Sequence, residues 1–371
     1  MLNKVIIAPD SFKGAISSIK AADTIAGEVK AAFPDCTIVK MPIADGGEGS
    51  VDTILAALGG EVFQAEVLSP DGRTIGASYG IASNKAAIIE MAQSSGITRQ
   101  EGLHPMTSNT YGFGQLIIAA LDRRAGDFIL CIGGSATTDG GCGMATALGA
   151  KFTDSSGNSF IPCGGTLGRI ARIDTSGIDR RIRESKFTVM CDVENPLHGI
   201  NGAAHVFSPQ KGADRGQVLE LDEGLRHFGA ILHNHFGRDF ASTPGAGAAG
   251  GLGAGCMAFL NAELVSGIEA ILKLCDFKTH LADTDLIITG EGKLDSQSFS
   301  GKVLSGILSN AGEVPVISIC GMCECDDELI RKHGLAVFEA REGISIEENM
   351  RDPEKYLRIA ARRAMLEAKG R

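Results

Sequence analysis

The sequence predicts an α/β fold of two domains, one of which contains a parallel, doubly wound sheet. The chain has 371 residues, more than the roughly 150 residues of a usual domain. At both ends of the chain, short apolar strands alternate with amphipathic helices, which is the pattern of a parallel sheet. Between the two ends, consecutive strands are joined by short turns, which is typical of antiparallel pairing. We therefore expect a second, mixed α/β domain inserted into the first.

The first elements of the chain follow a β-α-β-α order. An apolar strand over residues 5–8 precedes a helix over residues 18–33, which a Pro-Asp pair ends. Apolar residues recur in this helix at helical spacing: Ile19, Ala22, Ile25, Ala26, Val29 and Phe33. Residues 36–41 alternate as a strand, and two glycines close a helix over about residues 49–58. This order is the opening of a parallel sheet.

The middle of the chain begins as an antiparallel meander. The strands that we predict are residues 61–68, 74–82, 85–91, 128–132 and 186–191. The helices that we predict cover about residues 110–124, 219–237 and 259–275. Residues 151–160 resemble a hairpin, and residues 245–255 are a loop or the start of a helix. The region as a whole predicts a mixed sheet with helices.

The strand–helix alternation returns near the C-terminus. Strands are predicted over residues 285–292, 314–321 and 335–342, with helices between them. A basic amphipathic helix starts at Asp352, with Pro353 in a position suited to the first helical turn. We predict one parallel (Rossmann-like) domain formed by residues 1–60 and 285–371, and an inserted mixed α/β domain over residues 61–284.

Composition and charge exclude several classes of function. The formal net charge is −10 and no run of Lys or Arg is present, which argues against a nucleic-acid partner. No apolar stretch approaches the roughly 18 residues of a membrane span, and the N-terminus predicts a strand rather than a signal peptide. The ten cysteines form one cluster, Cys320, Cys323 and Cys325, and a structural zinc site would need a second such group. We therefore expect reduced thiols in a cytoplasmic protein.

Four predicted strands end in a loop that carries acidic or lysine side chains. The loops are Asp10-Ser11-Phe12-Lys13, Asp45-Gly46-Gly47-Glu48, Asp192-Val193-Glu194-Asn195 and Gly290-Glu291-Gly292-Lys293-Leu294-Asp295. In parallel sheets, ligands bind beyond the carboxyl ends of the strands, where such loops converge. The alternative is that Asp and Gly are simply good turn formers. Four such loops after apolar strands favour a binding site.

Glycine is abundant, at 49 of 371 residues against a usual fraction of about 7%, and it is clustered. The segment 133–141, GGSATTDGG, offers backbone N–H groups, hydroxyls and one carboxylate, which suit phosphate accompanied by Mg²⁺. Its Asp139 could instead cap the next helix. Residues 245–250 fit G-x-G-x-x-G without the preceding strand of a dinucleotide site. They either bind phosphate through backbone N–H groups or allow close packing.

No motif for nucleophilic catalysis stands in the context that it needs. The one G-x-S-x-G match, residues 76–80, lies inside a predicted strand and not at a strand-to-helix turn. The sequence lacks the G-x-x-x-x-G-K-[ST] of a P-loop, and its eight histidines are scattered. Carboxylates, a few lysines and Gly-rich loops instead favour phosphoryl transfer. Two other classes remain open: a hydroxy-acid dehydrogenase that uses NAD through residues 245–250, and a non-catalytic acid-binding or regulatory module.

Seven motifs occur in the order and spacing of the bacterial glycerate kinase type I family, which the chain resembles nearly end to end. They are IAPDSFKG, PIADGGEG, TYGFGQLI, IGGSATTDGG, CDVENPL followed by GAAHVFSPQKGA, GAGAAGGLGAG and DLIITGEGKLDSQS. The resemblance implies two α/β domains with the active site in the cleft between them. It also implies phosphorylation of D-glycerate by ATP to 2-phosphoglycerate, although unrelated glycerate kinases make the 3-phosphate. We expect Mg²⁺ as a cofactor, no membrane, and a monomer or homodimer.

Residue type and loop position suggest roles for this reaction. As catalytic residues we expect Asp192, Asp45 and Lys13, with Asp192 as the base or a metal ligand because it follows a buried strand directly. As metal ligands we expect Glu291 and Asp295. The expected substrate- and phosphate-binding residues are Ser11, Lys211, Lys293, Gly133, Gly134, Ser135, Gly245, Gly247 and Gly250.

Two positions depart from the pattern of the family. Thr138 stands where Asn is usual, and Lys293 stands where Arg is common. Lysine keeps the positive charge of arginine but loses its bidentate geometry. If position 293 holds a phosphate or the substrate carboxylate, its affinity for that group will differ.

Overall fold

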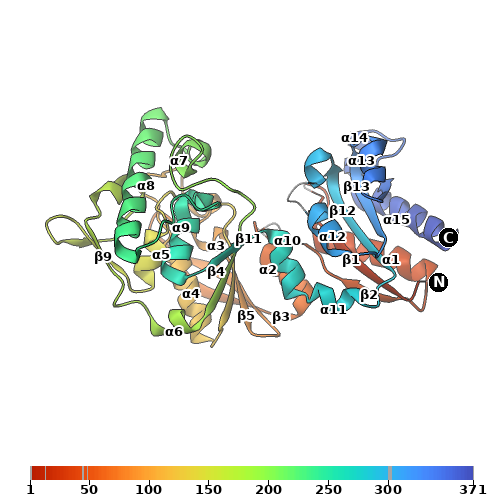
Figure 1. Cartoon of the computed structure of the whole chain (residues 1–371), viewed down its shortest axis with the longest axis horizontal. Helices are drawn as coiled ribbons and strands as arrows, with labels where there is room; N and C mark the ends of the chain where they lie inside the picture. The colour runs from red at the N-terminus through yellow and green to blue at the C-terminus, as the bar shows by residue number, and fades with distance from the viewer. Residues whose placement is uncertain (1, 13, 44–45, 48, 300–302, 371) are drawn as a thin grey trace. The chain divides into compact units, whose positions relative to one another are not determined.

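The chain folds as two compact units in a computed structural model that describes residues 2–12, 14–43, 46–47, 49–299 and 303–370 (Figure 1). Unit 1 comprises Met1–Asp45, Ala56–Leu58 and Ser266–Arg371, and unit 2 comprises Gly46–Leu55 and Gly59–Val265. Both chain ends thus belong to unit 1. The domain boundaries after residue 60 and before residue 285 stay a prediction, because compactness alone does not delimit a folding domain.

Unit 1 is built on a five-stranded parallel sheet in the order β14-β13-β12-β1-β2. Its strands are β1 (Lys4–Pro9), β2 (Thr37–Lys40), β12 (Leu286–Leu294), β13 (Val316–Cys323) and β14 (Ala336–Glu339). Its helices are α1 (Ser18–Ala32), α10 (Gly267–Leu274), α11 (Phe277–Leu281), α12 (Val303–Asn310), α13 (Asp327–Lys332), α14 (Ile346–Arg351) and α15 (Pro353–Gly370). The prediction of a parallel sheet formed by both chain ends is confirmed.

Both faces of this sheet are covered, as a doubly wound fold requires. Val5 and Ile7 on β1 pack with α1 and α15, in a core that includes Leu357 and Ala361. Ile6, between them, is fully buried and points to the opposite face, because successive side chains of a strand alternate. The strand order is the 2-1-3-4-5 arrangement of doubly wound sheets, and its switch point lies between β1 and β12.

Unit 2 is built on a six-stranded mixed sheet in the order β11-β10-β6-β5-β4-β3. Its strands are β3 (Gly60–Leu68), β4 (Thr74–Ala82), β5 (Ala86–Glu90), β6 (Asp127–Cys131), β10 (Lys186–Met190) and β11 (Glu263–Val265). The strands β3, β4 and β5 form the predicted antiparallel meander, whereas β5, β6, β10 and β11 are parallel. A small antiparallel sheet, β7 (Lys151–Thr153), β8 (Ser159–Phe160) and β9 (Arg172–Asp174), contains the predicted hairpin.

The helices of unit 2 include several short ones and one long one. They are α3 (Ala92–Ser95), α4 (Tyr111–Asp122), α5 (Cys142–Ala147), α6 (Arg180–Glu184), α7 (Ala203–Phe207), α8 (Arg215–Phe236) and α9 (Ala248–Leu260). The helix α2 (Ser50–Leu58) has residues in both units. Across all the helices that the structure describes, none combines the length and the apolar character needed to span a membrane.

The prediction of one helix over residues 259–275 is wrong. The helix α9 ends at Leu260, because Asn261 adopts a left-handed conformation with φ of 51° and caps it. Residues 263–265 then form the edge strand β11, which pairs in parallel with β10. Ser266 starts the next helix by accepting a hydrogen bond from the backbone N–H of Glu269.

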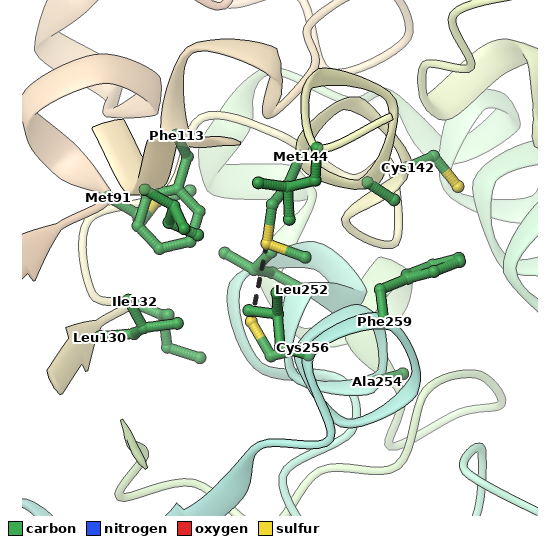
Figure 2. Packing of buried hydrophobic residues seen from close by; sticks show 14 of the residues in the cluster. Met91, Phe113, Leu130, Ile132, Cys142, Met144, Leu252, Ala254, Cys256 and Phe259 are labelled. Carbon is green, nitrogen blue, oxygen red and sulfur yellow. Dashed lines mark hydrogen bonds between the residues drawn. The ribbon is translucent and has the colours of Figure 1, made fainter. Parts of the chain in front are cut away.

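A dense apolar core joins β6, α4, α5 and α9 in unit 2 (Figure 2). Leu130 and Ile132 come from β6 and the residue just beyond it, and Phe113 comes from α4; all three are buried. Met144 on α5 and Cys256 on α9 are fully buried, with their sulfur atoms 4.0 Å apart. This core supports the loop that follows β6.

Candidate functional site

Unit 1 contains a cavity of about 400 Å³ at the carboxyl ends of its parallel strands. Its lining includes residues that follow β1, the last residues of β12 and β13, and residues that follow β14. The strands β1 and β12 flank the switch point of the sheet, where doubly wound folds bind their ligands. The lining residues are Asp10, Ser11, Phe12, Ala15, Ile16, Glu291, Gly292, Lys293, Asp295, Gly321, Met322, Ala340, Arg341, Ile346, Asn349, Met350, Pro353 and Leu357.

Four of the predicted site residues meet at this cavity: Ser11, Glu291, Lys293 and Asp295. The prediction placed residues 290–295 in a loop, but β12 continues through Leu294 because Lys293 and Leu294 pair with Met322 and Cys323 of β13. The Lys293 Nζ lies 2.7 Å from a Glu324 carboxylate oxygen, which raises the pKa of Lys293. The predicted catalytic residue Lys13 lies outside the described residues.

The carboxylates at the cavity fit a magnesium ion that arrives with phosphate groups. Asp10, Glu291 and Asp295 all line the cavity, and hard oxygen ligands of this kind suit Mg²⁺. No group of three or more His, Cys, Asp or Glu within the described ranges is arranged to hold a metal ion by itself. Magnesium usually binds through one or two carboxylates together with substrate phosphates, so an incomplete protein cage is compatible with it.

In unit 2, the loop 132–141 leaves the carboxyl end of β6, between β5 and β10. The Gly133 N–H donates to the carbonyl oxygen of Gly46 over 3.0 Å. A Cβ on Gly133 would lie 2.9 Å from that same oxygen, so only glycine allows this approach. Gly134 has a left-handed φ of 75°, and its carbonyl accepts from the Ile97 N–H. Both glycines therefore shape the loop.

A buried lysine donates hydrogen bonds to the same loop and so supports its conformation. Lys211 is 2% exposed, and its Nζ lies 2.8 Å from the Ser135 hydroxyl and 2.5 Å from the Thr137 carbonyl oxygen. Burial lowers the pKa of Lys211 to about 7, while the charge of Asp139 acts in the opposite direction. Ser135 is itself 7% exposed. The structure thus brings these two predicted residues together as a buried pair.

Replacing Lys211 with Met should change how stability depends on pH. Below pH 7, Lys211 carries its proton in both the folded and the unfolded protein. Between pH 7 and the usual lysine pKa of 10.5, only the unfolded chain keeps this proton. Stability of the wild type therefore rises with pH in this window, by about 2 kcal/mol relative to Lys211→Met between pH 6.5 and 8.5. Urea unfolding at both pH values measures this difference.

Lys293→Met is the control for that comparison, because the pKa of Lys293 is raised and the side chain stays charged throughout. Its unfolding free energy should follow the wild type in parallel at both pH values. The burial of the Lys211 amine is contradicted if the unfolding free energy of the wild type minus that of Lys211→Met stays constant or falls as pH rises.

Asp139 serves as an internal cap. It is fully buried and accepts hydrogen bonds from the backbone N–H and the hydroxyl of Thr110, each over 2.8 Å. It also accepts from the N–H groups of Gly141 and Gly143. Burial raises the pKa of Asp139, and these donors oppose the shift. The carboxylate accepts from N–H groups at the start of α4 and at the start of α5. This is the helix-capping role that the sequence offered as an alternative to metal binding.

The glycines of residues 245–250 pack against neighbouring backbone. The Gly247 N–H donates to the Asn195 carbonyl over 2.9 Å, and a Cβ on Gly247 would lie 2.2 Å from the Pro196 oxygen. A Cβ on Gly250 would lie 2.0 Å from the Thr137 oxygen, and Gly245 has a left-handed φ of 84°. Close packing explains these glycines; phosphate binding by them stays a prediction.

Asp192 follows β10 at the same edge of the sheet as the loop 132–141. It is exposed, and β10 pairs with β6 so that Met190 lies beside Cys131. A Cβ on Gly46 would lie 3.1 Å from the Met190 Cβ, so the segment 46–47 reaches this edge too. The predicted catalytic residue Asp45 lies outside the described residues.

Two residues of interest were missed by sequence reasoning. Glu90 ends β5, is 2% exposed, and accepts from the Val51 N–H over 2.7 Å; burial raises its pKa. Its position at the end of an apolar strand was the available signal.

Asn349 on α14 lines the unit 1 cavity, and its Nδ2 is buried without a hydrogen-bond partner in the described structure. No sequence motif marks it.

Comparison with known proteins identifies the family. The model of the glycerate kinase family matches residues 5–369. The chain belongs to the glycerate kinase family. A glycerate kinase of Halalkalibacterium halodurans is 45% identical over 97% of both chains, and a glycerate 2-kinase of Escherichia coli is 44% identical over 90% of both. A crystal structure from Salmonella typhimurium superposes with a TM-score of 0.89 at 38% identity, covering 100% of this chain and 99% of that one.

Within the glycerate kinase family fold, the two unusual residues occupy different settings. Thr138 is fully buried, and its hydroxyl lies 3.1 Å from the Ser208 hydroxyl, just before the turn that carries Lys211. It is therefore part of the support of the loop. Lys293 lies at the unit 1 cavity with 46% of its side chain exposed, where it can reach a ligand.

Proposed function

We propose that this protein transfers the γ-phosphoryl group of ATP to the 2-hydroxyl of D-glycerate, giving 2-phosphoglycerate and ADP. The observation that carries the proposal is the 44% identity to a glycerate 2-kinase over 90% of both chains. The chemistry of the two sets of residues supports it. Phosphoryl transfer needs positioning, charge neutralisation and one group to accept the hydroxyl proton, and it needs no nucleophilic side chain.

Each residue set has a part in this reaction. We assign the nucleotide phosphates to the unit 1 cavity, near Ser11 and Lys293. Magnesium bound by Glu291 and Asp295 would neutralise charge on the phosphates. We assign proton acceptance to Asp192, which is exposed at the carboxyl edge of the unit 2 sheet. As the glycerate oxygen attacks phosphorus, its proton passes to this carboxylate and the bond from phosphorus to ADP breaks.

Lys211 acts through the loop that it supports. With 2% of the residue exposed, its amine donates to the Ser135 hydroxyl and the Thr137 carbonyl, and so fixes the N–H groups of residues 133–135. Lys13 and Asp45 remain candidates for contact with the substrate. All ten cysteines are free thiols, which supports a reducing, cytoplasmic location.

A coupled assay of ADP release tests the proposal. With ATP and Mg²⁺, the protein should release ADP when D-glycerate is added, and far less with other small hydroxy acids. Phosphorus NMR of the product then distinguishes the 2-phosphate from the 3-phosphate. Binding of glycerate without ADP release would instead indicate an acid-binding module. Oxidation of glycerate with reduction of NAD would indicate a dehydrogenase, although residues 245–250 lack the preceding strand of a dinucleotide site.

A further inference from the structure

We propose that the unit 1 cavity binds the adenine and ribose of the nucleotide, with the base at the side formed by α14, α15 and the end of β13. This inference rests on the proposed function and adds the location and recognition of the nucleoside. The cavity of about 400 Å³ lies in the range of sites for ligands of drug size, far larger than the small acid glycerate requires.

The walls of the cavity divide into a charged side and an apolar side. The charged side comes mainly from the residues at the ends of β1 and β12, which flank the switch point of the sheet: Asp10, Glu291, Lys293 and Asp295. Arg341, which follows β14, adds a further cation. The apolar side comes from the end of β13 and from α14 and α15: Met322, Ile346, Met350, Pro353 and Leu357. A nucleotide has the same division, with a charged phosphate end and a flat, largely apolar base. Glycerate has no apolar face to bury.

Methionine side chains suit the faces of a planar base. Met322 and Met350 both line the apolar side, and thioethers are polarisable and adapt to aromatic rings. Met350 is 48% exposed, so burial by a ligand would remove apolar surface from water. Phe12, which is 5% exposed, adds an aromatic side chain from the segment after β1.

The Asn349 amide supplies a polar group for the edge of the base. Its Nδ2 is buried with no hydrogen-bond partner in the part of the chain that the structure describes, an arrangement that costs free energy unless an acceptor is supplied. Asn349 lines the cavity, and the χ2 torsion of Asn is broad, so rotation of the amide can present this donor to a ligand there. In the pair that an Asn amide forms with adenine, Nδ2 donates to N7 and Oδ1 accepts from the 6-amino group. The second of these bonds would let Asn349 select adenine over bases that lack the 6-amino group.

The absence of tryptophan from the sequence allows a direct binding test. Met350→Trp places a single indole at the mouth of the cavity. ADP should change its emission in a saturable manner, and D-glycerate alone should not. Leu219→Trp is the control, because position 219 on α8 of unit 2 is 64% exposed and no nucleotide should affect it. A response of Met350→Trp to glycerate but not to ADP would overturn the inference.

Kinetics of Asn349→Leu provide a second test that does not depend on the indole. The KM for ATP should rise about threefold to tenfold, with kcat and the KM for glycerate unchanged. The variant should also lose the preference of the wild type for ATP over ITP, in which a carbonyl oxygen replaces the 6-amino group. Asn234→Leu, at an exposed position of α8, should behave as wild type.

The two hypotheses fail in different ways. In one outcome, the protein is an active glycerate kinase, but Asn349→Leu keeps the KM for ATP and the preference for ATP over ITP. The emission of Met350→Trp also does not change with ADP. The nucleoside then binds elsewhere. That result overturns the inference and leaves the proposed function intact. A wild-type protein that binds no ADP by calorimetry and releases none with any hydroxy acid overturns both.

Discussion

Asp192→Asn should lower kcat for glycerate phosphorylation by about 10²- to 10⁴-fold, the usual effect of removing a general base. The KM for ATP should stay within about threefold, because the nucleotide is assigned to unit 1. The amide keeps the size of the side chain but cannot accept the hydroxyl proton. Steady-state kinetics with ADP release as the readout measure both constants.

Asp127→Asn is the matched control for this variant. Asp127 is exposed and lies at the amino end of β6, the opposite end of the same parallel sheet, where ligands do not bind. It should keep wild-type kcat. Asp45→Asn tests the other candidate base that the sequence predicts. If Asp192→Asn and Asp45→Asn both keep kcat within about threefold, neither carboxylate is the base.

The sequence was sufficient to predict the parallel unit, because its strands and helices carry clear local patterns. The apolar run Val5, Ile6 and Ile7 forms a strand in which all three residues are fully buried, and the apolar spacing of α1 forms the predicted helix. The strand order could not be predicted in this way. The pairing of β1 with β12 joins residues about 280 positions apart, and local periodicity contains no information on such contacts.

The strand β11 shows how tertiary pairing can override a local pattern. Residues 259–275 have apolar residues at a spacing compatible with a helix. The structure interrupts that helix at Asn261, and Glu263–Val265 obtain their backbone hydrogen bonds from β10 instead. A three-residue strand has too little sequence of its own to be detected before its partner is known.

Residue type alone did not separate ligand contact from internal support in the candidate site. Lys211 and Lys293 look equivalent in the sequence, yet one is 2% exposed and the other has 46% of its side chain exposed. The difference comes from the surroundings. Lys211 sits in a short turn beneath the loop 132–141, and Lys293 sits on the last residues of β12. Burial of a lysine depends on contacts distant in sequence, which no motif records.

Gly250→Ala should destabilise the protein by about 2–5 kcal/mol, the sum of overpacking and a left-handed backbone. The new Cβ would lie 2.0 Å from the Thr137 carbonyl oxygen and 2.7 Å from the Thr138 Cα, both backbone atoms. Neither can move without displacing the loop 132–141. The melting temperature should fall by on the order of 10 °C, and activity should fall with it because the loop shifts.

Gly237→Ala separates the steric part of this effect from the backbone part. Gly237 has a φ of 69°, against 70° for Gly250, but a Cβ there meets nothing within 4 Å. The free energy of unfolding of Gly237→Ala should fall by only about 1–2 kcal/mol, the contribution of the left-handed conformation. The two variants carry the same backbone strain, so the difference between their melting temperatures measures the contact with Thr137. Equal melting temperatures would mean that α9 and the loop 132–141 can move apart without loss of stability. Residues 245–250 would then be available to bind a ligand and would not be required for packing.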